Sequence, residues 1–544
     1  MCSINELSRA IFDENTPKPA DLEDRYPPRL AEGAVTRMAP SPTGFLHIGS
    51  LFSAFANRLA AKDGIFFLRL EDTDKKREVE DGVSAIIEGL RQFGVEPDEG
   101  VVGADKERGD YGPYVQSRRG PIYHAYARKL LEEGLAYPCF CGAEDLDGLR
   151  AEQERAGANK GYYGAWARCR NLTPEEQISR VEAGEAYTLR LKSPGNPDRK
   201  IIVQDVIRGR LELPENFMDA VILKTDGIPT YHFAHAVDDH LMRTTHVIRG
   251  DEWIASLPLH IQLFAVLGFK PPKYAHTASV LKDDNGGKRK LSKRRDPEAA
   301  VSWFAEQGYP ALAVREYLLT LLNSNFEDWR RANPGAAPED FPFSLKKMSP
   351  SGALFDLQKL EDVSKNVISR MRAEDVYDQA LAWARLYDVE LAACLEKDEA
   401  YAISMLAIDR DNLKPRKDIG RWNQARGLFG YFYGELYEPL PQERPDARKI
   451  LGAYLDAYHP EDSKDKWFSR VKDICEPLGY SPDVKAYKRN PEQFRGHVGD
   501  VSGAIRWAIA SRANTPDLWA VMRVLGETRV RQRIQAAIAA AKSR

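Results

Sequence analysis

The strongest constraint on the fold is an alternation of strand and helix patterns near the N-terminus. Val35 to Ala39 is a short strand-like run, which the prolines at positions 40 and 42 would end. Apolar side chains then recur four residues apart from Ile48 to Leu59, which is the spacing of a helix. A second strand-length run spans Ile65 to Leu70, and a second helical pattern spans Asp81 to Phe93. This order predicts an α/β domain with a parallel sheet.

The length of the chain requires further domains. The sequence has 544 residues, whereas a single hydrophobic core stops growing at about 250–300 residues. From 114 to 219 the alternation gives way to helical stretches mixed with short alternating runs, which predicts an α+β insertion. Strand patterns return at 220–223 and 245–248, and a helical pattern follows them. The α/β domain is therefore expected at 34–113 and 220–300, with mostly helical structure after it.

Charge and cysteine content exclude several classes of protein. The net charge of −3 excludes a uniformly basic nucleic-acid coat but leaves room for a local basic groove. Six cysteines are too few for a disulfide scaffold, and the chain has no apolar run of the roughly 18 residues that could cross a membrane. The acidic N-terminus lacks the pattern of a secretion signal. We expect a cytoplasmic protein with no membrane contact and a polar, partly disordered extension at 1–33.

The C-terminal segment is the most basic part of the sequence. Residues 480–544 hold twelve Lys and Arg against five Asp and Glu. Two interpretations stay open, a solvated helix face and a surface that faces RNA.

A segment rich in proline and glycine joins the first strand to the first helix. It reads Ala39-Pro-Ser-Pro-Thr-Gly44-Phe-Leu-His47-Ile-Gly49. The N–H groups at a helix start, with the positive end of the helix dipole, suit phosphate groups. Gly44 and Gly49 let the backbone approach a ligand closely, and His47 can donate a hydrogen bond to a phosphate oxygen. Taken alone, such a segment is usually only a turn.

A basic segment follows more than two hundred residues later. It reads Gly286-Gly-Lys288-Arg-Lys290-Leu-Ser-Lys293-Arg294-Arg295, in which six of ten residues are Lys or Arg. Lysines beside glycines form a mobile cationic loop that can neutralise the charge that develops on a leaving pyrophosphate. Taken alone, this segment would be an exposed basic loop.

Together, the two segments resemble the signatures of class I aminoacyl-tRNA synthetases. His47-Ile-Gly49-Ser50 resembles HIGH with a final Ser, and Lys290-Leu-Ser-Lys293-Arg294 resembles KMSKS. The stretch from Arg37 to Gly44 resembles glutamyl rather than glutaminyl enzymes. Five more segments resemble the glutamyl-tRNA synthetase family: Leu68 to Asp74, Tyr114 to Arg118, Pro229 to Ala234, Val237 to His240 and Thr245 to Trp253.

The resemblance implies both an architecture and an activity. A Rossmann-type catalytic domain at 34–113 and 220–300 would be split by an insertion, 114–219, that holds the acceptor end of tRNA. An all-helical stem-contact domain (301–375) and a helical anticodon-binding domain (376–544) would follow, as in bacterial members. The enzyme, expected as a monomer, would use ATP and Mg²⁺ to convert L-glutamate to glutamyl-adenylate. It would then transfer glutamate to the 3'-terminal adenosine of tRNA(Glu).

The resemblance also assigns site residues. Arg37 would bind the γ-carboxylate and Glu71 the α-amino group, because a guanidinium and a carboxylate are the natural partners of those charges. The other expected pocket residues are Ser41, Tyr231, His235 and Arg249. The expected nucleotide site comprises His47, Gly49, Glu252, Trp253 and Lys293, and the expected catalytic positions are His47, Lys290 and Lys293. His235 replaces an Asn that is usual in the family, and its imidazole could donate to a carboxylate or narrow the pocket.

Three cysteines resemble a zinc site found in some members of the family. They are Cys139, Cys141 and Cys169, one ligand short of the usual four. Position 171, where a fourth ligand is expected, is Asn, and Tyr162 and Tyr163 have an unexpected spacing. A Zn²⁺ site and three reduced thiols therefore both stay open.

Two other functions also stay open. A glutaminyl-tRNA synthetase is the nearest alternative, and a catalytically inactive tRNA-binding module is the alternative from a different class. The joint presence of His47, Glu71 and Lys293 argues against the inactive module.

Overall fold

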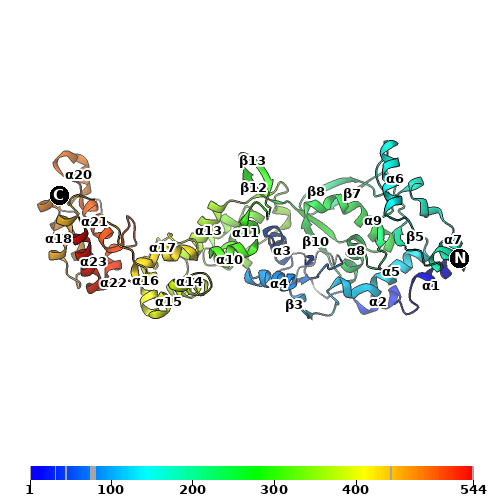
Figure 1. The fold of residues 1–544 in the computed structure, drawn as a ribbon, viewed down its shortest axis with the longest axis horizontal. Helices are drawn as coiled ribbons and strands as arrows, with labels where there is room; N and C mark the ends of the chain where they lie inside the picture. The colour runs from blue at the N-terminus through cyan, green and yellow to red at the C-terminus, as the bar shows by residue number, and fades with distance from the viewer. Residues whose placement is uncertain are drawn as a thin grey trace. The chain divides into compact units, whose positions relative to one another are not determined.

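A computed structural model describes residues 2–30, 32–42, 46–73, 81–292, 294–441 and 444–541. The chain forms two compact units. The first unit contains residues 1–303 and 315–356, and the second contains 304–314 and 357–544 (Figure 1). Residues 301–375, expected as one stem-contact domain, contribute to both units.

The predicted parallel sheet is present in the first unit. Its strands run in the order β1 (Val35–Met38), β2 (Ile65–Leu68), β3 (Glu99–Gly103) and β4 (Lys106–Arg108), and only the β3–β4 pair is antiparallel. The connecting helices are α3 (Ile48–Ala60) and α4 (Gly82–Gln92). All four residues of β1 are buried, as expected for a strand that is covered on both faces. The strands and helices predicted from the N-terminal alternation are thus confirmed.

A second parallel pair continues beside β1. It consists of β10 (His246–Gly250) and β11 (Lys273–Thr277), and the Thr245 amide donates to the Val35 carbonyl at 2.9 Å. Helices α8 (Tyr231–Leu241) and α9 (Leu257–Leu267) pack on each other next to this pair (Figure 1). This arrangement, in which strands from both sides of the insertion lie side by side, is the predicted Rossmann-type domain.

The insertion is an α+β structure, as predicted. Its elements are α5 (Gly120–Glu132), β5 (Ala136–Cys139), α6 (Ala143–Arg155), α7 (Pro174–Glu182), β6 (Thr188–Leu191), β7 (Lys200–Asp205) and β8 (Gly209–Pro214). The strand β9 (Val221–Leu223), expected in the α/β domain, pairs antiparallel with β6 instead. The reason is that β6 already pairs with β5 on one edge and leaves its other edge to β9.

The N-terminal extension is folded, which corrects the expectation of partial disorder. It forms α1 (Cys2–Ile11) and α2 (Pro19–Arg25), and α1 packs against α5 and α7 of the insertion. Leu7, Phe12, Leu22 and Tyr26 are buried, so the helices bury their apolar side and leave most of their acidic side chains in solvent. The average composition of the segment is polar and does not reveal this apolar face, because it averages over both faces of each helix.

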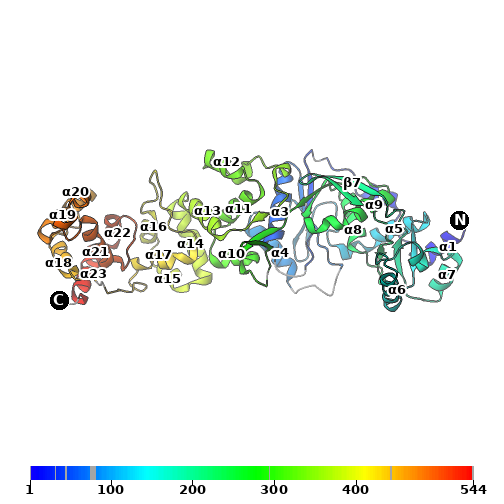
Figure 2. The same cartoon turned by 90° about the horizontal axis from the view of Figure 1, so that it is seen from above.

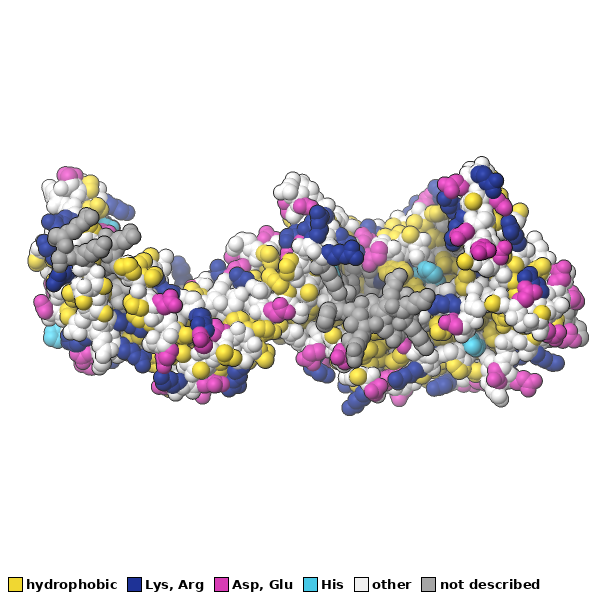
Figure 3. Space-filling view, viewed as in Figure 1, with side chains coloured by type: hydrophobic (Ala, Val, Ile, Leu, Met, Phe, Trp, Pro, Cys, Tyr) yellow, Lys and Arg dark blue, Asp and Glu magenta, His cyan; other side chains and the backbone are white. Residues whose placement is uncertain are grey.

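The basic segment forms a β-hairpin. Its strands are β12 (Val280–Asp284) and β13 (Gly287–Lys290), and β14 (Ala353–Leu354) pairs parallel with β12. The helices that follow are α10 (Val301–Gln307), α11 (Ala311–Leu322) and α12 (Phe326–Ala332). On the face drawn in Figure 3, Lys and Arg side chains gather on this hairpin.

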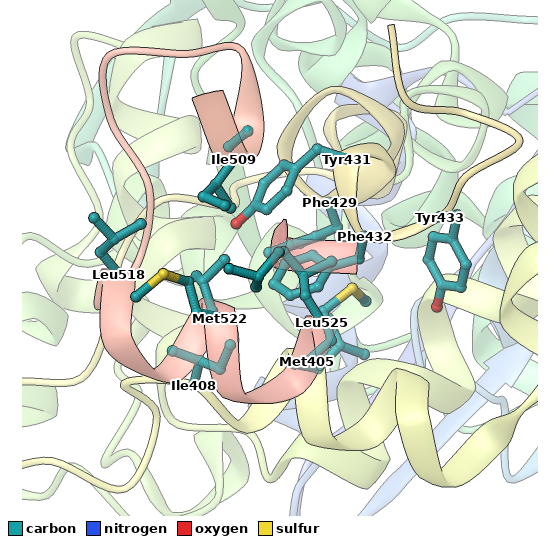
Figure 4. Packing of buried hydrophobic residues seen from close by; sticks show 14 of the residues in the cluster. Met405, Ile408, Phe429, Tyr431, Phe432, Tyr433, Ile509, Leu518, Met522 and Leu525 are labelled. Atoms are coloured by element: carbon teal, nitrogen blue, oxygen red, sulfur yellow. The ribbon is translucent and has the colours of Figure 1, made fainter. Parts of the chain in front are cut away.

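The second unit is helical over its described residues, as predicted. Its helices are α13 (Leu357–Ser369), α14 (Ala373–Tyr387), α15 (Val389–Lys397), α16 (Glu399–Ala407), α17 (Ala425–Phe429), α18 (Ala447–Ala457), α19 (Lys464–Asp473), α20 (Val484–Arg489), α21 (Val498–Ala510), α22 (Leu518–Leu525) and α23 (Glu527–Ala540). Helices α18, α19, α21 and α23 group together (Figure 2). Side chains from α16 and α22 converge on aromatic residues around α17, which form one hydrophobic core (Figure 4).

Several C-terminal arginines are used inside the second unit. Arg533 is buried and donates to the carbonyls of Ile509 and Tyr431, both at 2.6 Å. Arg529 donates to the Tyr401 hydroxyl at 2.9 Å, and Arg531 pairs with Glu527. Part of the positive charge of 480–544 is thus used in contacts within the second unit, some between helices and some within α23. Among the described residues, no helix is long and apolar enough to cross a membrane.

Candidate active site

A cavity of about 560 Å³ opens in the first unit where β1, β10 and the helix start of α3 meet. Its wall contains ten of the residues expected at the site: Arg37, Ser41, His47, Gly49, Glu71, Tyr231, Arg249, Glu252, Trp253 and Lys290. They come from segments as far apart as β1 and β13. The cavity lies at the carboxyl ends of parallel strands, where α/β sheets bind ligands.

Arg37 is held at the bottom of the cavity by a buried carboxylate. It is 3% exposed, and its Nε lies 3.2 Å from both carboxylate oxygens of Asp239 on α8. The Nη1 of Arg69, also fully buried, donates to Asp239 at 2.7 Å. Burial alone would raise the pKa of Asp239, but the charges of Arg37 and Arg69 hold it well below its ordinary value. Asp239 therefore stays ionised and fixes the direction of both guanidinium groups.

Glu71 presents a buried carboxyl group at the end of β2. It is 8% exposed and accepts a hydrogen bond from Arg69 Nη2 at 3.2 Å. Burial raises the pKa of Glu71 to about 7, although the charges of Arg69 and Arg37 oppose the shift. A cation that entered the cavity beside Glu71 would favour its ionised form.

The start of α3 forms another side of the cavity. His47 is the N-cap residue, and its Nδ1 accepts a hydrogen bond from the Gly49 amide at 3.0 Å. A Cβ atom on residue 49 would lie 3.3 Å from this nitrogen, so a side chain here would crowd the His47 ring. The positive end of the helix dipole at this helix start favours a bound anion.

The basic hairpin also borders the cavity. Lys290 ends β13, and its Nζ lies 3.9 Å from the exposed carboxylate of Glu252. The neighbouring Arg289 forms two hydrogen bonds with Asp296, at 2.6 and 2.7 Å. Asp296 thus ties Arg289 to the base of the hairpin, while Lys290 lines the cavity. A cation in this position can approach a polyphosphate bound at the start of α3.

Comparison with known proteins identifies the family. The model of "tRNA synthetases class I (E and Q), catalytic domain" matches residues 34–330. A glutamate–tRNA ligase of Clostridium perfringens strain 13 is 50% identical over 98% of this chain and 100% of its own length. One from Sorangium cellulosum strain So ce56 is 45% identical over 95% of this chain and 97% of its own length. The chain belongs to the class I glutamate–tRNA ligases.

Solved structures of glutamate–tRNA ligases have the same fold. The enzyme of Elizabethkingia meningosepticum, solved in complex with its amino acid, matches with a TM-score of 0.76 and 27% identity, and the match covers 94% of this chain and 100% of that chain. The enzyme of Elizabethkingia anophelis matches with a TM-score of 0.74 and 27% identity, over 93% of this chain and 100% of that chain. The predicted family, fold class and enzyme class are thereby confirmed.

Two expected residues of the ligase site are not among the described residues that line the cavity. Lys293 lies outside the described residues, as does Gly44. His235 is fully buried and stands behind the wall, where its ring stacks on Tyr231 with centroids 5.9 Å apart. Its Nδ1 lies 2.9 Å from Asp239, and its Nε2 lies 3.1 Å from the Tyr274 hydroxyl. His235 was expected to contact the amino acid, but both of its ring nitrogens face protein groups.

The three insertion cysteines meet in one group. Their Sγ atoms all lie within 4.8 Å of one another. The Tyr162 hydroxyl lies 3.3 Å from the Sγ of Cys141 and accepts a hydrogen bond from the Cys169 amide at 3.0 Å. A hydrogen bond from Cys169 lowers the pKa of Cys139 below its ordinary value. Three sulfur atoms and an adjacent phenol oxygen fit a cation such as Zn²⁺.

Sequence reasoning missed several residues that organise the site. Asp239 and Arg69 lie inside segments that resemble the family, but nothing in their spacing indicated that they support Arg37 and Glu71. Tyr162 stands at an unexpected spacing, yet the turns between it and Cys169 bring its hydroxyl to the thiols.

Proposed function

We propose that the cavity activates L-glutamate with ATP and that the enzyme then transfers glutamate to the 3'-terminal adenosine of tRNA(Glu). One observation carries the proposal. A single cavity holds two buried arginines, a buried carboxyl group and a helix start bordered by a lysine. These groups match the two carboxylates, the ammonium and the phosphates of glutamate and ATP.

In this proposal, protein groups bind and orient the reactants, and none acts as a nucleophile. Arg37 binds the γ-carboxylate, Arg249 completes the pocket, and Glu71 accepts from the α-ammonium. Ser41 and Tyr231 supply hydroxyl groups. Burial raises the pKa of Tyr231 to about 12, so this hydroxyl stays protonated and can donate.

The nucleotide occupies the side of the cavity near α3. His47 and Gly49 receive the phosphates, Glu252 and Trp253 border the nucleotide, and Lys290 with Lys293 neutralises the pyrophosphate. An oxygen of the glutamate α-carboxylate attacks the α-phosphorus, and the bond to pyrophosphate breaks. A ribose hydroxyl of the terminal adenosine then attacks the activated carbonyl, and AMP leaves. The catalytic contribution is positioning and charge stabilisation, with Mg²⁺ bound alongside ATP.

The metal and the helical domains extend the proposal. Cys139, Cys141 and Cys169, with Tyr162 beside them, would hold Zn²⁺, which would stabilise the insertion that receives the tRNA acceptor end. Within the helical part of the chain, the segments at 301–375 and 376–544 would contact the tRNA stem and the anticodon. We further propose that the enzyme acts as a monomer.

Charging of in vitro transcripts tests the proposal. Transcripts of tRNA(Glu) and tRNA(Gln) are each offered labelled glutamate or glutamine with ATP. We expect glutamate on tRNA(Glu) and no glutamine on either transcript. Transfer of glutamine would support the glutaminyl alternative and remove the role given to Arg37, and transfer of neither amino acid would support the inactive tRNA-binding module. Glutamate on tRNA(Gln) as well would extend the tRNA specificity.

A further inference from the structure

Arg249 is held by histidines rather than by a carboxylate. It lies on β10 and is the register partner of His276 on β11, so the parallel ladder brings the two residues side by side. Arg249 Nε donates to His276 Nε2 at 3.1 Å, and Arg249 Nη1 donates to His260 Nδ1 on α9 at 3.1 Å. Arg249 is 6% exposed, and both histidines are fully buried.

The hydrogen-bond directions fix the protons on both histidines. A guanidinium group has no lone pair to accept with, so the imidazole nitrogens that face Arg249 must accept. The proton of His276 is then on Nδ1, which donates to Asp205 Oδ2 at 2.7 Å. The proton of His260 is on Nε2, which donates to His232 Nδ1 at 2.9 Å. Both rings that contact Arg249 are therefore neutral.

Asp205 is fixed in turn by the insertion. It ends β7, is 4% exposed, and accepts hydrogen bonds from the amides of Ile207 and Arg208 at 2.9 Å each. Burial alone would raise the pKa of Asp205, but the hydrogen bonds from His276 and from backbone amides lower it. Asp205 is thus an ionised anchor that selects one tautomer of His276. Burial also lowers the pKa of His276 and of His260, which favours their neutral forms.

This support leaves one side of the Arg249 guanidinium for a ligand. Among the described residues, the buried Nη2 of Arg249 has no hydrogen-bond partner, and Arg249 lines the cavity. The rings of Tyr274 and Trp253 lie 4.9 and 5.9 Å from its guanidinium carbon. Arg37 differs, because Asp239 compensates its charge directly. The neutral acceptors around Arg249 hold its orientation without cancelling its charge.

We propose that His276 and His260 are positioning residues that aim the uncompensated charge of Arg249 at a carboxylate of the bound glutamate, with Asp205 fixing the tautomer of His276. The inference rests on the proposed function. It adds to that function a reason why the pocket prefers an anionic amino acid. A charge left without a counterion in a buried pocket attracts a carboxylate strongly and gains less from a neutral amide.

The test compares two substitutions of one residue. His276→Gln keeps an acceptor near the former Nε2, whereas His276→Leu removes it. Charging of the tRNA(Glu) transcript gives the KM for glutamate, the KM for ATP and kcat. We expect His276→Leu to raise the KM for glutamate about tenfold, because a buried donor of Arg249 loses its acceptor. The KM for ATP and kcat should change less than about twofold, as expected for a loss of uniform binding.

Rescue and control variants make the result specific. His276→Gln should restore the KM for glutamate to within about threefold of the unchanged enzyme. The pair His260→Asn and His260→Leu repeats the comparison for the histidine on α9. If His276→Leu does not fold, Asp205→Asn tests the carboxylate that anchors His276. His246→Leu is the matched control, since His246 lies on the same strand, β10, and does not line the cavity.

Three results would overturn the inference. The first is an unchanged KM for glutamate in both leucine variants. The second is an equal rise of the KM for glutamate in His276→Gln and His276→Leu. The third is a parallel change in the KM values for all substrates together with a lower melting temperature. These results are distinct from failure of the proposed function, in which the unsubstituted enzyme itself does not charge tRNA(Glu) with glutamate.

Discussion

Binding of L-glutamate is expected to release a proton from Glu71. Burial raises the pKa of this carboxyl group from 4.5 to about 7 in the ligand-free cavity. The α-ammonium of glutamate would lower this pKa, because an adjacent positive charge favours the carboxylate. A group with a pKa of about 7 is half protonated at pH 7. Binding would therefore release about half a proton at pH 7, almost one at pH 6 and almost none at pH 8.5.

The same titration sets the pH dependence of affinity. Only the ionised fraction of Glu71 can accept from the ammonium, so below a pH of about 7 the apparent Kd for glutamate should rise about tenfold for each pH unit lost. Above that pH the affinity should level off. Glu71→Gln removes the titration and should bind glutamate weakly, without release of a proton.

Folding stability should respond with the opposite sign. The pKa of Glu71 is higher in the folded than in the unfolded chain, so the folded state binds more protons between pH 4.5 and about 7. The contribution of Glu71 to stability is therefore present below pH 4.5 and is lost as the pH rises to about 7, by on the order of 3 kcal/mol. Relative to the unsubstituted enzyme, Glu71→Gln should become more stable as the pH rises.

Isothermal titration calorimetry tests the proton release. Glutamate is titrated into the enzyme at pH 6, 7 and 8.5 in pairs of buffers with different ionisation enthalpies, and the difference in heat gives the protons released. The reasoning is refuted if the heats at pH 6 do not depend on the buffer. It is equally refuted if Glu71→Gln releases as many protons as the unsubstituted enzyme.

Three further predictions concern other parts of the site and the insertion. Arg37→Leu should lower kcat/KM for glutamate by about a hundredfold, because it removes a charged hydrogen-bond donor and leaves Asp239 with one fewer cation. Steady-state charging measures this, and a loss below threefold would contradict the role of Arg37. Gly49→Ala adds a Cβ that lies 3.3 Å from His47 Nδ1 and should have a small effect, whereas Gly49→Val adds two further methyl groups at this crowded helix start and should raise the KM for ATP about tenfold. Equal ATP kinetics in both variants would contradict it. Elemental analysis should find about one zinc ion per chain in the unsubstituted enzyme and none in Cys141→Ser. Cys394→Ser in the second unit is the matched control. An enzyme that contains no zinc when purified with zinc present would contradict the proposed metal site.

Local sequence patterns determined the elements of the Rossmann-type domain. The strand β2 is a short apolar run, β1 is a short run that prolines end, and α3 has apolar side chains at helical spacing. These elements are recognisable because the signal and the structure it predicts lie in the same few residues. The partner of β9 is not local. A three-residue strand has no pattern that distinguishes the edge of β6 from an edge of the parallel sheet.

The N-terminal helices and the zinc ligands show the same limit. The burial of Leu7 and Phe12 depends on α5 and α7, more than a hundred residues away along the chain. The approach of Tyr162 to the thiols depends on two short 3₁₀ turns, one at Gly164–Trp166 and one at Arg168–Asn171 that contains Cys169. The spacing of residues along the sequence does not predict which side chains such turns bring together.

Within the site, the resemblance to the family supplied the residues that line the cavity but not those that support them. Arg37 and Arg249 belong to segments that can be matched one residue at a time. Their supports, Asp239 for Arg37 and His276 for Arg249, become visible only when α8 and β11 are placed beside the strands that carry the arginines. A hydrogen bond between distant segments leaves no pattern in a single sequence.

A crystal structure of the enzyme with L-glutamate would test the central claim most directly. The account predicts that the γ-carboxylate accepts hydrogen bonds from Arg37, that the ammonium lies against Glu71, and that Arg249 Nη2 donates to a carboxylate oxygen of the ligand. Glutamate bound with its ammonium away from Glu71, or with neither carboxylate at the two arginines, would contradict the account.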